Sequence, residues 1–387
     1  MGTPAKKIAI AILFLIITSA DPIFANLPSP ESVPIAETLI IPILTYHRII
    51  PKTTSIYDFT PQMLEGHFKL FKSLGYQTLS AAEFIAYQQN STLFPKKPLV
   101  LTFDDGNKSH YTWAFPLLKK YGYHATFFIY PKAIHDVSEV CLTWAELKEM
   151  SDAGFDIESH TLSHPYLSRS SITLGDVHSN AAYQNWLTNE LQCSKNILEA
   201  KLAKKISMLA YPFGWFDSAV ESAAIKAGYQ GVFTVNWGQN TPSENLFRIK
   251  RRVMDSTMDL AYIEHYITAK PLALKAITPK DTEIISNLPP IQFRIQTPGI
   301  HSVTVKVRNQ KESLTPDDQG IYTFNKTTAL KPGYIMVIVK GYDDQNNYYL
   351  GSWGFNYQVV HQPQPTAPPV EKGPFKEIED TGTSPRP

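Results

Sequence analysis

The feature that most constrains the fold is an alternation of short apolar segments with longer amphipathic ones between residues 41 and 253. Such alternation is typical of a parallel sheet whose strands are joined by helical crossovers. The expected strands are Ile41–Tyr46, Leu99–Phe103, Ala125–Tyr130, Phe155–Ser159, Ile206–Tyr211 and Val232–Val235. The expected helices are Gln62–Leu74, Ala81–Gln88, Trp113–Tyr121, Thr143–Ala153 (which begins with a capping-box pattern, Thr143 and Glu146), Val177–Lys204 and Asp217–Ala227. We therefore predict an α/β fold built as a distorted (β/α) barrel, with functional residues at the C-terminal ends of its strands.

The strongest functional signal is the segment Leu99–Gly106, an apolar run that ends in Asp104, Asp105 and a glycine. Consecutive strand side chains point to opposite faces, so both carboxylates can serve one site only where the strand stops. Gly106 permits the sharp turn that this requires. Two adjacent carboxylates at such a place can supply a metal ligand beside a general base. The structural alternative is a strand followed by a surface Asp-Gly turn.

A second strand-like segment leads into His160 and His164, which are four residues apart. On a helical turn two such histidines share a face and can bind one cation together. The chain contains 11 histidines, so a pair at this spacing is a weak signal by itself. One carboxylate and two imidazoles, however, form a ligand set that leaves zinc an open position for water. With Asp105 as the third ligand, Asp104 becomes the natural base.

These two segments resemble the first two motifs of the polysaccharide deacetylases, carbohydrate esterase family 4. The third motif of that family is usually Arg-x-Pro-Tyr-Gly. The segment Ala210–Gly214 is similar to it, with Ala210 in place of the arginine and Phe213 in place of the tyrosine. The usual late Leu-x-His motif is not evident, whereas Pro42–Ile49, which contains His47, lies before the paired aspartates. That order resembles the circularly permuted branch, the poly-β-1,6-N-acetylglucosamine deacetylases, and the resemblance covers roughly residues 40–255.

The resemblance implies a hydrolase that removes N-acetyl groups from a polysaccharide containing N-acetylglucosamine. Poly-N-acetylglucosamine, chitin oligomers and peptidoglycan all present such groups, and the sequence does not choose among them. The metal ligands would be Asp105, His160 and His164. This donor set suits Zn²⁺ best, with Co²⁺ or Ni²⁺ as alternatives, and a bound divalent metal lowers the pKa of its water.

The same resemblance implies roles for the remaining site residues. Asp104 would take the proton as water attacks the acetamide carbon, and His47 would protonate the leaving amine. The backbone N–H of Phe213 would help to bind the tetrahedral oxyanion. The alternative for His47 is a structural histidine, buried beside Tyr46.

The arginine that is missing from the third motif holds the catalytic aspartate in the family. We expect Arg251, in the segment Phe247–Val253, to supply that charge from another strand, with a solvated basic strand edge as the alternative. Tyr211, Trp215 and Trp237 are candidates for a surface on which a sugar ring stacks. The alternative is that they are part of the core, as at least half of such aromatic residues are by default.

Composition favours an exported globular enzyme. Residues 1–25 are predicted to be a signal peptide, with Lys6 and Lys7 before a short apolar stretch, and a retained N-terminal anchor is the alternative. Removing this segment also removes Asp21, so the 36 basic and 35 acidic residues become 34 and 34. A balanced charge does not favour binding to nucleic acid or to an anionic membrane. We expect a periplasmic, cell-envelope or extracellular location.

A chain of 387 residues exceeds a usual single domain, and its pattern of apolar residues changes near residue 283. Ile291–Ile295, Ser302–Val307 and Tyr334–Lys340 alternate with period two, which predicts a small antiparallel β-sandwich of the immunoglobulin-like kind. The aromatic residues of Ser352–Phe355 either pack in its core or, on a loop, contact a glycan. The predicted divisions are a signal peptide (1–25), a deacetylase barrel (26–275), a β-sandwich (283–360) and a proline-rich disordered tail (361–387).

Several properties stay open at this level. Cys141 and Cys193 either pair in an oxidising compartment or remain free thiols. We expect a monomer whose β-sandwich can associate with the cell envelope and whose partner is an N-acetylated glycan. A glycan-binding protein on an inactive deacetylase scaffold is the alternative function. A glycosidase fits less well, because its two carboxylates must straddle a bond about 5 Å or more apart.

Overall fold

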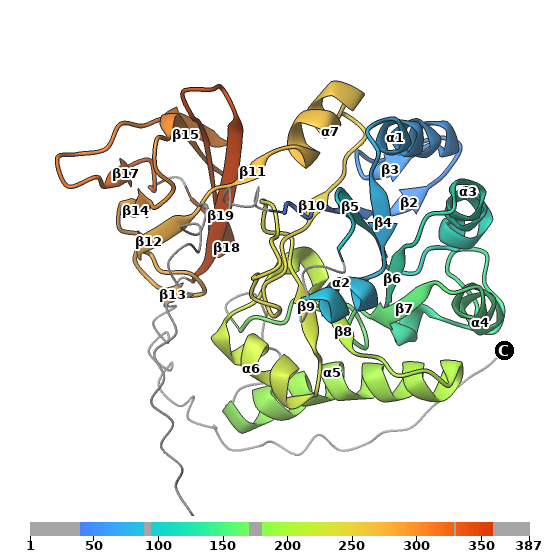
Figure 1. Ribbon diagram of the computed structural model, residues 1–387. Coiled ribbons are helices and arrows are strands. Elements are labelled where there is room, and N and C mark those ends of the chain that lie inside the picture. The colour runs from blue at the N-terminus through green and yellow to red at the C-terminus, as the bar shows by residue number, and fades with distance from the viewer. Residues whose placement is uncertain (1–38, 89–93, 170–179, 329, 359–387) are drawn as a thin grey trace, which may run out of the picture. The chain divides into compact units, whose positions relative to one another are not determined.

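The computed structural model describes residues 39–88, 94–169, 180–328 and 330–358 (Figure 1). The described residues from Leu39 onward belong to one compact unit. The predicted signal peptide and the predicted tail lie outside the described residues. Within the described ranges, no helix combines the length and the hydropathy that a bilayer span needs.

A parallel sheet forms the first part of this unit, as the alternation predicts. Its strand order is β10-β1-β5-β6-β7-β8-β9, β4 also pairs with β5, and every pairing is parallel. The strands are β1 (Ile43–Tyr46), β4 (Gln77–Leu79), β5 (Pro98–Asp104), β6 (Thr126–Ile129), β7 (Asp156–Ser159), β8 (Met208–Ala210), β9 (Gly231–Phe233) and β10 (Arg252–Val253). Ile249 pairs with Phe233 of β9, and three residues later β10 pairs with β1. The segment from Ile249 to Val253 thus contacts β9 at one end of the sheet and β1 at the other, which fits a distorted barrel.

Helices connect and flank these strands (Figure 1). They are α1 (Pro61–Ser73), α2 (Ala81–Tyr87), α3 (Phe115–Tyr121), α4 (Trp144–Asp152), α5 (Asn180–Leu202), α6 (Ser218–Lys226) and α7 (Leu260–Ile267), with short turns η2 (His110–Ala114), η3 (Pro131–Ala133) and η4 (Pro212–Gly214). The predicted capping box begins α4: the Glu146 carboxylate accepts from the Thr143 N–H at 2.8 Å, and the Thr143 hydroxyl accepts from the Glu146 N–H at 3.3 Å. The helix expected from Trp113 opens instead with the π-helical turn η2, because Pro116 has no N–H to continue a regular ladder.

The central strand β5 divides the core into two clusters. Leu99, Leu101 and Phe103 pack with the helices in one cluster, whereas Val100 packs with residues of the other strands inside the barrel. This alternation follows from the period of two along a strand. It also determines that Asp104, four residues after Val100, faces the barrel interior.

Two further sheets form the second part, which we call the β part (residues 270–358), in contrast to the barrel part (residues 39–269). The larger sheet has the order β11-β19-β18-β15-β16 with β13 beside β19, and the smaller has the order β12-β14-β17. These strands are β11 (Lys270–Pro271), β12 (Leu274–Thr278), β13 (Ile284–Ile285), β14 (Ile291–Ile295), β15 (His301–Val307), β16 (Gln310–Ser313), β17 (Tyr322–Phe324), β18 (Gly333–Tyr342) and β19 (Tyr348–Tyr357). The two-residue strands β2 (Arg48–Ile49) and β3 (Asp58–Phe59) pair apart from all of these.

The β part agrees with most of its sequence-based description. The three period-two segments form β14, β15 and β18, and apolar residues from both sheets share one cluster that includes Phe293, Val337 and Trp353. The larger sheet is mixed rather than purely antiparallel, since the short strands β11 and β13 run parallel to β19. Trp353 and Phe355 lie in β19 and are 5% and 0% exposed, so they pack in the core, and the alternative of a glycan contact on a loop does not apply.

Direct contacts join the two parts. Tyr334, Ile338, Tyr348 and Leu350 of the β part belong to the same hydrophobic cluster as the barrel helices. The segment after β9 is bonded from two sides: the Tyr334 hydroxyl donates to the side-chain oxygen of Asn236 at 2.9 Å, and the Ser352 hydroxyl donates to the Trp237 carbonyl at 2.6 Å. The β part therefore supports a loop at the C-terminal end of the barrel strands. Cys141 and Cys193 are free thiols.

Candidate active site

The predicted site residues meet at the C-terminal ends of the barrel strands. His47 follows β1, Asp104 ends β5, His160 follows β7 and Tyr211 follows β8. A cavity of about 560 Å³ opens there, and its lining includes every predicted site residue except Arg251 and Trp215. Trp215 packs against Tyr166, with 4.6 Å between the ring centroids. We call it the active-site cavity. The lining also includes Lys306 and Met336, so the β part contributes to its wall.

Three ligand atoms converge at one side of this cavity. The ligand atoms of Asp105, His160 and His164 lie within 4.8 Å of one another. Oδ1 of Asp105 is 3.5 Å from Nε2 of His160 and 3.2 Å from Nε2 of His164. Two ligands that are each about 2.1 Å from a tetrahedral zinc ion lie about 3.4 Å apart, so this spacing fits a shared cation. Among the described residues this Oδ1 is buried without a hydrogen bond, an acceptor that a cation would satisfy.

The tautomer of His160 also suits a ligand. Its Nδ1 lies 2.8 Å from the carbonyl oxygen of Ala210, which can only accept, so Nδ1 carries the proton. In the neutral ring Nε2 is then unprotonated, and this is the atom that faces Asp105. The residue that replaces the family arginine thus orients a histidine through its backbone.

The two histidines do not lie on a helical turn, and that expectation is wrong. Thr161 and His164 adopt left-handed backbone angles, with φ of 67° and 59°, and the Thr161 hydroxyl accepts from the His164 N–H at 3.1 Å. The physical reason is Pro165, because the residue before a proline is disfavoured in the right-handed helical region. Asp105 is also left-handed, with φ of 78°. Such strain at non-glycine residues persists only where the surrounding structure holds it, as is common at functional sites.

Asp104 is held by a buried arginine. Nη1 and Nη2 of Arg251 donate to the two carboxylate oxygens at 2.8 and 2.9 Å, and Nε donates to the Thr234 carbonyl at 3.0 Å. Arg251 is 0% exposed, which excludes the solvated strand edge for this residue. Burial alone would raise the pKa of Asp104, but the charge and hydrogen bonds of Arg251 outweigh it, so the pKa lies below its usual range. Asp104 is therefore an anion with a fixed orientation.

His47 faces the cavity from the end of β1, the strand beside β5. Its Nδ1 is buried without a hydrogen bond among the described residues, and its carbonyl accepts from Nε2 of His110 in the π-helical turn. Burial lowers the pKa of His47, whereas the charges of Asp104 and Asp105 act in the opposite direction. The neighbouring Tyr46 bonds to another histidine, so it does not hold the His47 ring.

The third motif forms the cavity's aromatic side. Phe213 has φ of 59° and is 44% exposed, and its ring stacks on Tyr166 with 3.9 Å between centroids. Gly214 follows with φ of 71°, and a Cβ there would lie 2.7 Å from the backbone nitrogen of Val235, so only glycine fits. Tyr211 is fully buried and stacks on Phe216, so its ring offers no face to a sugar, contrary to its predicted role.

Other lining residues were not anticipated from the sequence. Tyr57 is 48% exposed, and its ring lies 5.8 Å from that of His47. Trp237 lines the cavity as predicted, but the Arg252 guanidinium lies 3.8 Å from the centre of its ring and occupies one face. Arg251 and Arg252 are adjacent in the sequence, and the sequence alone does not show which of them faces the cavity. Lys306 lies in β15 of the β part, far along the sequence from the barrel motifs. Nothing in the sequence therefore connects it to this cavity.

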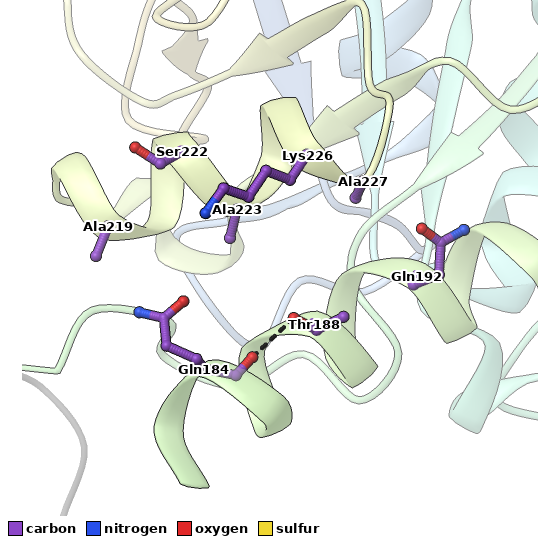
Figure 2. Close-up of a pocket in the computed structure, with 8 residues that line it drawn as sticks. All are labelled: Gln184, Thr188, Gln192, Ala219, Ser222, Ala223, Lys226 and Ala227. Carbon is purple, nitrogen blue, oxygen red and sulfur yellow. Dashed lines mark hydrogen bonds between the residues drawn. The ribbon is translucent and has the colours of Figure 1, made fainter. Parts of the chain in front are cut away.

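A second surface cavity, of about 470 Å³, lies between α5 and α6 (Figure 2). It is lined by Gln184, Thr188, Gln192, Ala219, Ser222, Ala223, Lys226 and Ala227. The Thr188 hydroxyl donates within its own helix to the Gln184 carbonyl at 2.8 Å. Lys226 is the one ionisable residue of this lining, so the cavity offers no acid–base pair.

Comparison with known proteins agrees with this geometry. A family model described as polysaccharide deacetylase matches residues 92–232. YxkH of Bacillus subtilis, named as a polysaccharide deacetylase, is 31% identical over 228 residues, which are 58% of this chain and 76% of that protein. The chain belongs to the polysaccharide deacetylase family. The resemblance described from the motifs is confirmed, and the protein is an N-deacetylase enzyme.

Other relatives support the same assignment. The poly-β-1,6-N-acetyl-D-glucosamine N-deacetylase of Staphylococcus epidermidis is 30% identical over 202 residues, 50% of this chain and 67% of that protein. The structure of the Streptococcus pyogenes deacetylase PplD in complex with acetate matches with a TM-score of 0.52 at 26% identity, covering 59% of this chain and 99% of PplD. IcaB from Ammonifex degensii, at 22% identity and a TM-score of 0.53, supports the fold of this polysaccharide deacetylase.

Proposed function

We propose that this deacetylase hydrolyses the N-acetyl groups of a polysaccharide containing N-acetylglucosamine, with a divalent metal held by Asp105, His160 and His164. The observation that carries the proposal is one cavity in which this donor set adjoins Asp104, a carboxylate fixed by Arg251. A divalent ion bound there supplies a Lewis acid. The donors suit Zn²⁺, with Co²⁺ and Ni²⁺ as alternatives.

Proton transfer falls to Asp104 and His47. A carboxylate oxygen of Asp104 accepts the proton of the attacking water, and Arg251 holds that oxygen in place. The lowered pKa of His47 makes its protonated ring a stronger acid, which suits donation to the leaving amine. The backbone N–H of Phe213 is our candidate donor to the oxyanion.

Substrate binding falls to the exposed aromatic residues. Tyr57 and Phe213 line the active-site cavity and are 48% and 44% exposed. Rings with one free face suit stacking on a sugar. Relatives named as poly-β-1,6-N-acetyl-D-glucosamine N-deacetylases support a glycan that contains N-acetylglucosamine as the substrate.

The cellular setting is a proposal from the sequence alone. We propose that residues 1–25 direct export, that the enzyme works as a monomer in the periplasm, cell envelope or outside the cell, and that the β part associates with the envelope. The barrel (26–275) and an immunoglobulin-like sandwich (283–360) remain our proposed domain divisions, although strands of the β part start at Lys270.

The proposal is tested by acetate release from oligomers of β-1,6-linked and β-1,4-linked N-acetylglucosamine. We expect acetate without new reducing ends, loss of activity after treatment with a chelator, and recovery with Zn²⁺. New reducing ends without acetate would indicate a glycosidase. Metal-loaded protein that binds these oligomers but releases no acetate would indicate a glycan-binding protein on an inactive scaffold. Either result overturns the proposal.

The role of His47 is tested by its replacement with asparagine. Loss of a positioned acid lowers the rate on an N-acetyl substrate by about 10²–10⁴-fold, with metal content unchanged. The loss is expected to be much smaller on an aryl acetate, because a leaving group of low pKa needs little protonation. Equal losses on both substrates, together with a lower melting temperature, would show that His47 is structural.

A further inference from the structure

A second groove continues from the active-site cavity, lined on one side by residues of the barrel part between Trp237 and Tyr262 and on the other by β15, β16 and β18 of the β part. It has a volume of about 510 Å³ and shares Trp237, Arg252, Asp255 and Lys306 with the active-site cavity. Its lining adds two lysines, Lys311 from β16 and Lys340 from β18. We call it the lysine groove. A polymer held in the active site can therefore extend into it without leaving the surface.

The lysines lie on one face of adjacent strands in an unfavourable arrangement. Lys306 of β15 is directly opposite Lys311 of β16. Lys340 of β18 is opposite Thr304, which is two residues from Lys306 on the same face. Like charges directly across a ladder destabilise a sheet. The clustered lysines do not stabilise the fold, so binding of an anionic ligand is the better explanation for them.

Neighbouring carboxylates do not neutralise the lysines. Asp255 pairs with Arg252 at 3.6 Å, and Asp259 caps α7 by accepting from the Tyr262 N–H at 2.7 Å. Within the part of the chain that the structure describes, no ion pair joins Lys306, Lys311 or Lys340 to an acid. Burial lowers the pKa of Lys340, and the positive charges of Lys311, Lys306 and Arg252 lower it further.

An aromatic ring holds the cations together. The charged groups of Arg252, Lys306 and Lys340 lie 3.8, 5.3 and 5.9 Å from the ring centre of Trp237. Such cation–π contacts offset part of the repulsion and keep the charges near one point. An anion there gains from several cations at once.

We propose that the lysine groove binds a carboxylate carried by the glycan, on a sugar near the N-acetyl sugar in the active site. The inference rests on the proposed function, because one chain must occupy both cavities. The groove is local and continuous with the active-site cavity, which favours a substituent of the same chain. The preferred substrate is then a glycan that alternates N-acetyl sugars with carboxylated ones rather than a neutral polymer.

The test compares three tetrasaccharides of equal length: neutral N-acetylglucosamine, N-acetylglucosamine alternating with glucuronate, and a strand carrying lactyl ether carboxylates. We expect the wild-type enzyme to prefer at least one carboxylated substrate in kcat/KM, and we expect 0.5 M salt to reduce that preference. The double variant Lys311→Gln/Lys340→Gln should lower the carboxylated-to-neutral ratio by about tenfold. Lys275→Gln, an exposed lysine of β12 outside both cavities, is the matched control and should leave the ratio unchanged.

A binding experiment separates this inference from the proposed function. Tetragalacturonate carries carboxylates but no acetyl group, and calorimetry should show about tenfold weaker binding to the double variant than to wild type. If no glycan yields acetate but this difference in binding is found, carboxylate binding in the lysine groove is supported and the proposed function is wrong. The proposed carboxylate site would be wrong if the wild-type enzyme preferred neither carboxylated substrate. It would also be wrong if the substitutions changed neither the carboxylated-to-neutral ratio of kcat/KM nor the affinity for tetragalacturonate. The single variant Lys311→Gln, at an exposed position, repeats the test without disturbing the partly buried Lys340.

Discussion

Replacing His160 with alanine is expected to remove metal binding and acetate release together. His160 is 2% exposed, and its Nε2 is oriented toward Asp105 by the bond from Nδ1 to the Ala210 carbonyl. A Lewis acid contributes several kcal/mol to such a reaction, so its loss lowers the rate by about 10³-fold or more. Metal content by mass spectrometry and acetate release on the same preparation measure both effects.

The same result is expected for Asp105→Ala and His164→Ala, since each supplies one of the three ligand atoms. His301→Ala is a matched control, because His301 is an exposed histidine of the β part and does not line the active-site cavity. It should keep full metal content and activity. One equivalent of tightly bound metal in all three ligand variants would contradict the assignment.

Replacing Asp104 with asparagine is expected to lower acetate release by about 10²–10⁴-fold, because an amide does not accept the proton. The change also leaves the buried charge of Arg251 without its partner. Breaking a buried pair from one side destabilises a protein by about 3–5 kcal/mol. A large fall in the free energy of unfolding should therefore accompany the loss of activity, and denaturant titration measures it.

A double-variant cycle separates these two effects. Arg251→Met alone leaves a buried carboxylate unpaired and should also destabilise the protein. Arg251→Met combined with Asp104→Asn removes both charges, and most of the stability should return while acetate release stays low. Near-normal acetate release in Asp104→Asn would remove Asp104 from the mechanism. Recovery of activity in the double variant would show that the single variant failed through unfolding alone.

The strands and helices of the barrel could be predicted because their signals are local. Apolar runs, caps and turn residues act within a few positions, as the capping box of Thr143 and Glu146 shows. The meeting of Asp104, Asp105 and His160 followed from one further rule, that parallel strands end at the same edge. The helical turn expected for His160 and His164 does not form, because Pro165 disfavours the right-handed helical region for His164.

Register explains why Arg251 was harder to predict than Asp104. Arg251 and Arg252 are consecutive residues of an extended segment, so their side chains point to opposite faces. Arg251 enters the barrel and binds Asp104, whereas Arg252 lies over Trp237 in the wall of the cavity. Only the pairing of β10 with β1 decides which of the two arginines enters the barrel. That pairing joins residues about 200 positions apart, so no local sequence signal reports it.

The remaining lining residues depend on tertiary packing. Tyr57 lies on an irregular loop, for which the sequence has no periodicity to read. Lys306 and Met336 reach the active-site cavity only because the β part packs against the segment after β9. Period-two alternation predicted their strands, but it contains no information about where a sheet docks.

The hydrophobic cluster that crosses from one part to the other has a consequence for folding thermodynamics. Tyr334 and Ile338 of β18 and Leu350 of β19 are buried in the cluster of the barrel helices, although their strands belong to the β part. Separating the parts would expose this apolar surface, so neither reaches its full stability alone. The free energies of the two parts are therefore coupled, and a core substitution in the β sheets is transmitted as strain or solvent exposure to the loop that holds Trp237. A β part placed on another barrel would therefore need a matching apolar surface on that barrel to be equally stable.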